Sequence, residues 1–77
     1  MTPLNFVIQF ERVEYEDAAL ALARRLFARF DERIDSLTLV PITEDDFALY
    51  LNGALVRSQR ASGESPRVAD VLALLAE

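Results

Sequence analysis

The sequence predicts a single mixed α/β domain in which two helices cover a four-stranded sheet with strand order 2-1-3-4. Three observations carry this prediction. Residues 4–10 alternate in polarity with a period of two, as in a strand with one apolar face. Residues 17–30 and 66–75 each repeat apolar side chains at spacings of three and four, as in amphipathic helices. Asn52-Gly53 separates two apolar runs, which is the strongest short signal for a β-hairpin.

The first strand and the first helix account for most of the predicted core. The helix is expected from about Asp17, whose negative charge suits the helix dipole in the first turn, to Phe30. We expect Phe27 to lie in the core, so that Phe27→Ala destabilises the fold by about 3 kcal/mol. Leu20 and Leu74 fall outside the apolar stripes. The stripe of the first helix consists of Ala19, Leu22, Ala23, Leu26, Phe27 and Phe30.

The second half of the chain supplies three strands and a helix. Residues 31–35 are polar and predict a loop, and the second strand is expected over 37–40, where Pro41 ends it. The third and fourth strands are expected over 47–51 and 54–58, on either side of the Asn-Gly turn. The order β-α-β-β-β-α then predicts a right-handed parallel crossover between the first two strands.

The last helix follows a loop expected over residues 61–64. Ser65 is a favoured N-cap residue and Pro66 is favoured in the first helical position. Four apolar residues then share one face of this helix: Val68, Val71, Leu72 and Leu75.

Composition excludes several classes of function. The chain has 77 residues, which indicates one domain over 1–77, and it contains neither cysteine nor histidine. Disulfides, thiol catalysis and thiolate or imidazole metal sites are therefore excluded. A net charge of −5 argues against nucleic acid as a partner. The sequence has no apolar run long enough to span a membrane and no basic signal-peptide start, so we expect a cytoplasmic protein.

Short motifs in a particular order suggest a family. The segments are 37–41 (LTLVP), 47–53 (FALYLNG), 56–60 (VRSQR) and 63–66 (GESP). In order and spacing they resemble the selenoprotein W-like (Rdx) family. Its members have a first strand, a Cys-x-x-Cys or Cys-x-x-selenocysteine loop and a helix rich in Ala, Leu and Arg. The resemblance implies a thioredoxin-like fold, and in those members a thiol or selenol redox activity.

The redox loop is where this chain departs from the family. Residues 14–19 are expected at its place, with Glu16 and Ala19 at the positions of the two chalcogen residues. Neither side chain can act in thiol–disulfide exchange, which needs a thiolate or a selenolate. The prediction is therefore a redox-inactive domain that is not an enzyme, has no catalytic residues and serves as a protein-interaction or scaffold subunit. The alternative is an oxidoreductase-related enzyme, or an auxiliary subunit of a redox system, with no thiol of its own.

Two further hypotheses concern ligands and partners. Glu11, Glu14 and Asp45 belong to acidic loops that could attract a hard cation, but a solvated acidic rim is favoured, so neither metal nor cofactor is expected. The resemblance implies that three loops meet at one end of the sheet, which is the predicted docking site for a protein with a basic patch. The predicted docking residues are Tyr15, Glu16, Ile42, Thr43, Glu44 and Ser65.

The competing hypothesis for self-association is a homodimer formed at the edge of the fourth strand. An exposed edge strand offers unpaired backbone groups to a second chain, and charged side chains guard such edges. Arg57 is predicted to be one of these guarding charges.

Overall fold

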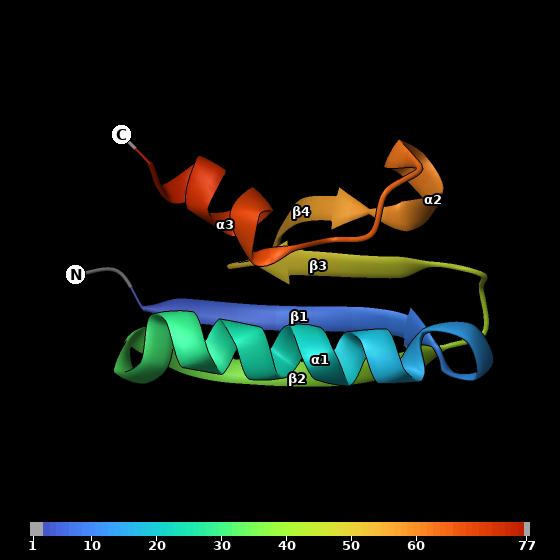
Figure 1. Ribbon diagram of the computed structural model, residues 1–77, viewed down its shortest axis with the longest axis horizontal. Helices are drawn as coiled ribbons and strands as arrows, with labels where there is room; N and C mark the ends of the chain where they lie inside the picture. Colours follow the sequence, from blue (N-terminus) through green and yellow to red (C-terminus); the bar gives the residue numbers. More distant parts are fainter. Residues whose placement is uncertain (1–2, 77) are drawn as a thin grey trace.

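The structure, a computed structural model, describes residues 3–76 and confirms the predicted order of strands and main helices. One short 3-10 turn and one short helix are added to that order (Figure 1). The elements are β1 (Leu4–Glu11), α1 (Arg12–Phe30), η1 (Asp31–Arg33), β2 (Ile34–Ile42), β3 (Phe47–Leu51), β4 (Ala54–Ser58), α2 (Gln59–Ser62) and α3 (Val68–Leu75).

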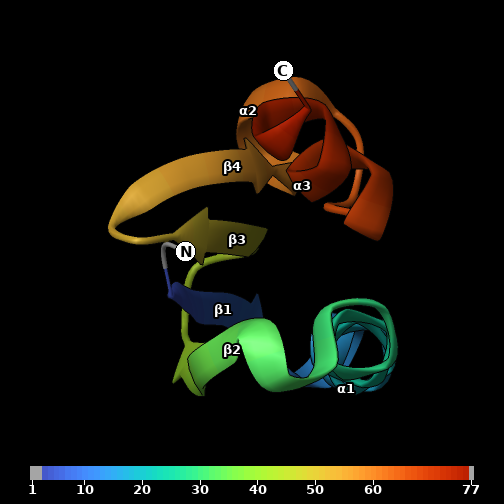
Figure 2. The same ribbon diagram turned by 90° about the vertical axis from the view of Figure 1, so that its left-hand side faces the viewer.

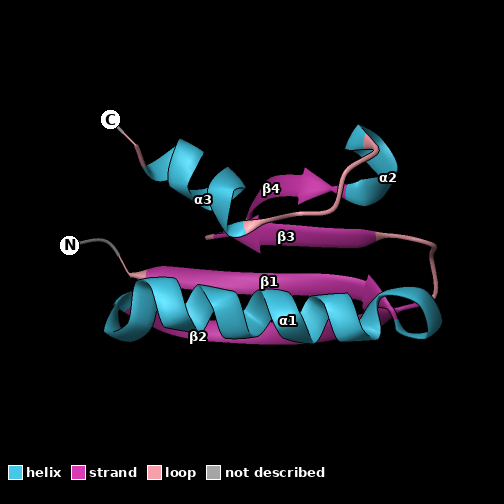
Figure 3. Ribbon diagram, viewed as in Figure 1, coloured by secondary structure: helices cyan, strands magenta, loops and turns pink. Residues whose placement is uncertain are grey.

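The four strands form one mixed sheet in the predicted order, β2-β1-β3-β4. β1 pairs with β2 in parallel, and β3 pairs with β1 and β4 in antiparallel fashion, as the coloured strands of Figure 3 illustrate. Figure 2 shows α1 and α3 on the same side of this sheet. None of the helices in residues 3–76 is long and apolar enough to cross a membrane.

The core lies between the sheet and the two long helices. Alternate residues of β1 are buried on the helix side, which confirms the period-two prediction. β3 contributes Phe47, Leu49 and Leu51 to the same layer, and α3 contributes Val71. The other predicted apolar residues of α3 pack against this core. The buried residues of β1 and α1 are Leu4, Phe6, Ile8, Phe10, Ala19, Leu22, Ala23, Leu26 and Phe30.

Helix α1 begins at Arg12, five residues before the predicted start at Asp17. The reason is local: Glu11 ends the strand and is itself the N-cap, and its carboxylate accepts a hydrogen bond from the backbone N–H of Glu14 at 2.8 Å. The strand therefore passes directly into the helix. Acidic residues such as Glu14 are also favoured in a first helical turn by the helix dipole.

Phe27 was predicted in the core, and this prediction is wrong. Its side chain is 51% exposed, whereas Leu26 is fully buried. Consecutive residues of an α-helix point about 100° apart, so when Leu26 faces the sheet Phe27 must point to the side. Leu20 and Leu74 are exposed, as predicted.

Strand β2 is longer than predicted, because it begins at Ile34, inside the expected loop, and continues through Pro41 to Ile42. The rest of the expected loop, residues 31–33, forms the 3-10 turn η1. The register of β2 with β1 runs from Leu4 opposite Ile34 to Glu11 opposite Ile42. β2 is an edge strand, so one side of its backbone needs no partner and a proline is tolerated there.

The connection from β4 to α3 also differs from the prediction. A short helix, α2, takes in the first two residues of the expected loop, and α3 begins at Val68 rather than at Pro66. The hydroxyl of Ser65 donates to the side-chain oxygen of Gln59 at 2.8 Å, so this serine is not the N-cap of α3. The backbone N–H of Arg67 instead donates to the Asp70 carboxylate at 2.9 Å.

The turn between β3 and β4 has the predicted geometry. Asn52 and Gly53 have φ angles of 51° and 86°, both in the left-handed region that a type I′ turn requires. The side-chain oxygen of Asn52 also accepts a hydrogen bond from the backbone N–H of Asn5 at 2.9 Å, which fastens the turn to the start of β1.

Replacing Gly53 by valine is expected to lower the free energy of unfolding by about 1 kcal/mol or more. A Cβ atom at Gly53 would have no atom within 4 Å, so the loss comes from backbone strain and not from a clash. Urea unfolding measures it. The matched control is Ala54→Val, which puts the same side chain into extended strand and should be nearly neutral. Equal stability of the two variants would contradict the strained turn.

Candidate functional site

Three segments meet at one end of the sheet: the β1–α1 junction, the β2–β3 loop and the β4–α2 junction (Figure 1). The backbone N–H of Glu11 donates to the carbonyl oxygen of Asp46 at 3.0 Å. The ring of Tyr15 stacks on Phe47 with centroids 5.6 Å apart and planes at 28°. We call residues 11–17 and 43–46 the acidic end.

Asp46 joins the segments of the acidic end to β4 and α2. Its Oδ1 accepts hydrogen bonds from the backbone N–H groups of Phe47 at 2.7 Å and Arg60 at 3.0 Å. The Ser58 hydroxyl lies 3.0 Å from both carboxylate oxygens. Partial burial alone would raise the pKa of Asp46, but the hydrogen bonds from Arg60, Phe47 and Ser58 outweigh it and hold the pKa below its ordinary value. The ionised form of Asp46 is therefore the form that organises this end.

Tyr15 is the aromatic residue of the acidic end. The pKa of its phenol is raised, first by desolvation and then by the negative charges of Asp45 and Glu14. The hydroxyl accordingly stays protonated at neutral pH. The phenol is therefore a hydrogen-bond donor, whereas the carboxylates around it, such as those of Asp45 and Glu14, are acceptors.

The charge of the protein is concentrated at this end. The acidic end holds seven of the thirteen acidic residues of the chain and one of its eight basic residues, Arg12. Its net charge is therefore −6, and the rest of the chain has a net charge of +1. Arg12 is itself paired with Glu16, at 3.3 Å between Nε and Oε1.

Five of the six predicted docking residues lie at the acidic end or directly beside it. Tyr15 and Glu16 are in the first turns of α1, Ile42 is the last residue of β2, and Thr43 and Glu44 follow in the loop. Ser65 lies on the connection between α2 and α3, where it is bound to Gln59. The topology brings the first five of these residues to one end of the sheet, and the contact of any of the six with a partner stays a prediction.

The structure places the predicted degenerate redox positions inside a helix and not on a loop. Residues 14–19 lie inside α1, and Ala19 is fully buried against the sheet, so this segment is not a solvent-facing loop. β1 joins α1 directly, between Glu11 and Arg12, and Glu16 and Ala19 lie further along the helix. Their correspondence to the redox pair of the family stays a prediction.

The acidic end does not bring its carboxylates together as a metal site. Within residues 3–76, no group of three or more acidic side chains is close enough to hold a metal ion. The polar groups of this end are carboxylates, a phenol and hydroxyls, and the chain contains no thiol. This arrangement can bind cationic groups, whereas thiol–disulfide exchange needs a sulfur or selenium nucleophile.

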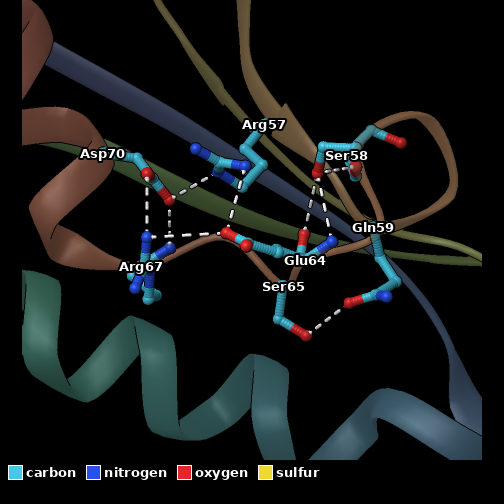
Figure 4. A network of polar contacts seen from close by, with 8 residues as sticks. Arg57, Ser58, Gln59, Glu64, Ser65, Arg67 and Asp70 are labelled. Atoms are coloured by element: carbon cyan, nitrogen blue, oxygen red, sulfur yellow. Dashed lines mark hydrogen bonds and ion pairs between the residues drawn. The ribbon is translucent and has the colours of Figure 1, made fainter.

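A second polar network fastens β4 to α3 (Figure 4). Arg57 Nε lies 3.0 Å from the Asp70 carboxylate, and its Nη1 lies 3.5 Å from Glu64. Burial alone would raise the pKa of Asp70, but hydrogen bonds from Arg57 and the backbone of Arg67 hold it below its ordinary value. The prediction that Arg57 guards the edge of β4 is wrong, because its side chain turns to the helix side and pairs with Asp70.

The arrangement defines a mixed α/β domain of β-α-β-β-β-α order whose first strand–helix junction carries no cysteine. The model of the Rdx family matches residues 8–77, and the chain belongs to the Rdx family.

Two solved structures share this fold. A crystal structure of a selenoprotein W-related protein from Vibrio cholerae has a TM-score of 0.82 at 21% identity, over 91% of this chain and 89% of that chain. A crystal structure of a protein from Bordetella parapertussis has a TM-score of 0.82 at 23% identity, over 96% of this chain and 95% of that chain. A search of curated proteins gives no match.

Proposed function

We propose that this chain is a redox-inactive Rdx domain that acts in the cytoplasm as a protein-binding subunit, and that its acidic end is the docking surface. The observation that carries the proposal is the acidic end itself. The strand–helix junction, where selenoprotein W-like proteins have a redox pair, lies here within a well-organised surface of net charge −6 that contains no sulfur.

The proposed loss of redox chemistry follows from the residue types of the chain. Thiol–disulfide exchange begins with attack by a thiolate or a selenolate, and carboxylates do not replace these nucleophiles. The predicted redox positions, Glu16 and Ala19, carry a carboxylate and a methyl group, and the chain contains no cysteine. The scaffold around them is nevertheless held in place by Asp46 and by the stacking of Tyr15 on Phe47.

The charge of the acidic end sets the kind of partner. A surface with six net negative charges attracts a basic patch, speeds its approach and rejects acidic surfaces. Tyr15 adds a half-buried ring, a type of residue that is common at the centre of interfaces. The partner is thus expected to be a protein that presents arginine or lysine side chains around an apolar contact.

The test is capture of a partner from a lysate of the native host, with mass spectrometry to identify it and two charge-reversal variants to map its site. Reversing Glu16 and Glu44 to arginine should weaken binding by about tenfold or more, which is about 1.4 kcal/mol. It should also make binding less dependent on salt. The melting temperature should change little, because Glu44 is exposed and the Arg12–Glu16 pair is a solvent-exposed one.

The matched control makes the same charge change at the opposite end of the sheet. Glu32 and Asp35 are both exposed there, and reversing both to arginine should leave capture within about twofold of the parent. Equal weakening by the two double variants would show that only net charge matters. Capture that survives reversal of Glu16 and Glu44 but is lost on substitution in β4 would contradict the docking site.

A further inference from the structure

Four of the six large apolar side chains that are exposed within residues 3–76 belong to α1 and β2. Three of them, Val13, Leu20 and Phe27, follow one another at a spacing of seven residues along α1. Seven residues are close to two helical turns, so these side chains form one stripe. The fourth is Leu39, which lies on the helix side of β2, beside the buried Ile8 of β1.

The stripe lies on the side of α1 that faces the outer edge of β2. Tyr15 marks the other side of the helix, because its ring stacks on Phe47 of β3. At 100° per residue, the stripe residues point about 120–160° away from Tyr15 around the helix axis. Since β2 and β3 lie on opposite sides of β1, the stripe points to the side of β2, and Figure 2 shows no element of residues 3–76 beyond that strand.

The outer edge of β2 is an uncharged strand with unpaired backbone groups. Within residues 3–76, β1 is its only neighbouring strand. The five residues 36–40 carry no charge, whereas features that usually protect a sheet edge lie just outside them. The register shift leaves Asp35 without an opposite residue in β1, and Pro41 follows on the other side. Both lie three residues from Thr38, so the unprotected segment extends equally to either side of its centre.

We propose that the outer edge of β2 pairs in antiparallel fashion with β2 of a second copy of this chain, forming a homodimer with one continuous sheet. A two-fold axis through Thr38 places Leu37 opposite Leu39 of the second copy, with Cβ atoms about 5 Å apart. The same axis brings α1 next to its own copy. A second copy is the occupant because the strand layer and the helix layer are both complementary to themselves about this one axis.

The separation of the two helices fits direct packing. α1 contacts both β1 and β2, so it lies above this pair of strands. Strands about 4.8 Å apart place the two-fold axis about 5 Å from the middle of the pair, so α1 and its copy lie about 10 Å apart. Packed helices are about 8–10 Å apart, so the two apolar stripes meet.

The stripe also matches its own copy along the helix. α1 and β2 run in opposite directions, and their middle residues are Ala21 and Thr38. The axis through Thr38 therefore passes close to Leu20. In the antiparallel pair of helices, Leu20 contacts its own copy and Val13 contacts Phe27 of the second copy, as in a heptad seam.

The charges beside the stripe are complementary in the same arrangement. Asp17 and Arg24 each follow a stripe residue by four positions, so they lie along the same border of the stripe. Both are exposed, and neither takes part in an ion pair among residues 3–76. Antiparallel helices place each Asp17 opposite Arg24 of the second copy, which gives two ion pairs across the dimer.

The size of this surface is that of a reversible dimer. α1 has 19 residues and is about 28 Å long. The helix layer and the sheet layer are each about 10 Å thick, so the projected area is about 560 Å² on each copy. The dimer then buries about 1,100 Å² in total, above the roughly 1,000 Å² expected of a specific interface and at the lower end of that class. We expect a dissociation constant in the micromolar range.

Sedimentation equilibrium of the full chain from about 1 µM to about 1 mM tests this dimer. The parent should pass from monomer to dimer, and Phe27→Lys should raise the dissociation constant by about tenfold or more, because it puts a charge into the apolar contact. The matched controls are Leu74→Lys on α3 and Leu55→Lys on β4. These leucines are 59% and 48% exposed, close to the 51% of Phe27, but they lie away from the proposed axis, so both variants should dimerise like the parent.

A charge swap tests the antiparallel arrangement itself. Asp17→Arg and Arg24→Asp should each weaken dimerisation by about fivefold, because like charges then meet across the axis. The double variant has the net charge of the parent and should dimerise like it. Thermal melts check that each variant folds, and Leu20→Lys replaces Phe27→Lys if the latter does not. A monomeric parent at 1 mM, a folded stripe variant that dimerises like the parent, or a double variant as weak as the single ones would overturn the assignment.

Discussion

Replacing Phe30 by alanine is expected to lower the free energy of unfolding by about 3–5 kcal/mol. Phe30 is 2% exposed and packs on Phe6 with ring centroids 5.9 Å apart. The guanidinium groups of Arg29 and Arg33 also lie over its ring, each 5.6 Å from the centroid. Alanine leaves a cavity where the last turn of α1 meets β1, and it removes the surface on which both arginines rest.

A loss of this size is large for so small a domain. At about 0.05–0.15 kcal/mol per residue, a chain of 77 residues is stable by only about 4–12 kcal/mol. Urea unfolding followed by circular dichroism should show a large fall in the midpoint, and the Phe30 variant should be partly unfolded at moderate temperature.

The matched control is Phe27→Ala in the same helix. Phe27 is 51% exposed, so its truncation should change the free energy of unfolding by less than about 1 kcal/mol. The two variants make the same chemical change three residues apart. If Phe27→Ala is as destabilising as Phe30→Ala, α1 packs on the sheet with a different face from the one observed.

Phe27 also shows what the sequence could not decide. Leu26 and Phe27 are adjacent apolar residues, and either one continues a stripe at spacings of three and four. Which of them faces the core depends on how the helix sits on the sheet, and the helical pattern alone does not contain that information. By contrast, the Asn52-Gly53 turn was predictable, because its positive φ angles are a local property of the two residues.

The limits of the second strand have the same kind of explanation. A proline disrupts a strand where a neighbouring strand needs its missing N–H as a hydrogen-bond donor, but it is tolerated on the outer side of an edge strand. Pro41 is in the second situation. That β2 is an edge strand follows from the strand order, which was predicted. β2 extends over nine residues because it pairs in parallel with all eight residues of β1, with one register shift between Leu4 and Asn5.

The predicted order of the elements indicates which segments meet at one end of the sheet, but not their local structure. The order of the elements was enough to bring Tyr15 and Glu44 to one end of the sheet. The start of α1 was predicted at Asp17 and lies at Arg12, so the direct passage from β1 into the helix was missed. Glu11 gave a usable signal, since an acidic residue after an apolar strand can cap a helix that follows at once.

Replacing Asp46 by alanine is expected to lower the free energy of unfolding by about 2–3 kcal/mol at neutral pH. A hydrogen bond to a charged acceptor contributes about 1.5–3 kcal/mol, and at this partly exposed position water replaces part of what the three donors lose. Its carboxylate accepts from Phe47, Ser58 and Arg60, and it is the link between the β2–β3 loop and α2. The substitution leaves the buried Ser58 hydroxyl without this acceptor. Asp45→Ala is the matched control, because Asp45 is exposed and should be nearly neutral.

The same carboxylate makes stability depend on pH in a defined direction. The pKa of Asp46 is lower in the folded protein than its ordinary value of about 3.9, so folding favours the ionised form. Its contribution is fully present above that ordinary pKa and is lost as the pH falls through the lower folded pKa. Asp70, whose pKa is lowered in the same way, acts in the same direction. On going from neutral pH to a pH below 4, the urea midpoint should therefore fall more for the parent and for Asp45→Ala than for Asp46→Ala. A parallel fall in all three proteins would show that Asp46 does not hold the acidic end together.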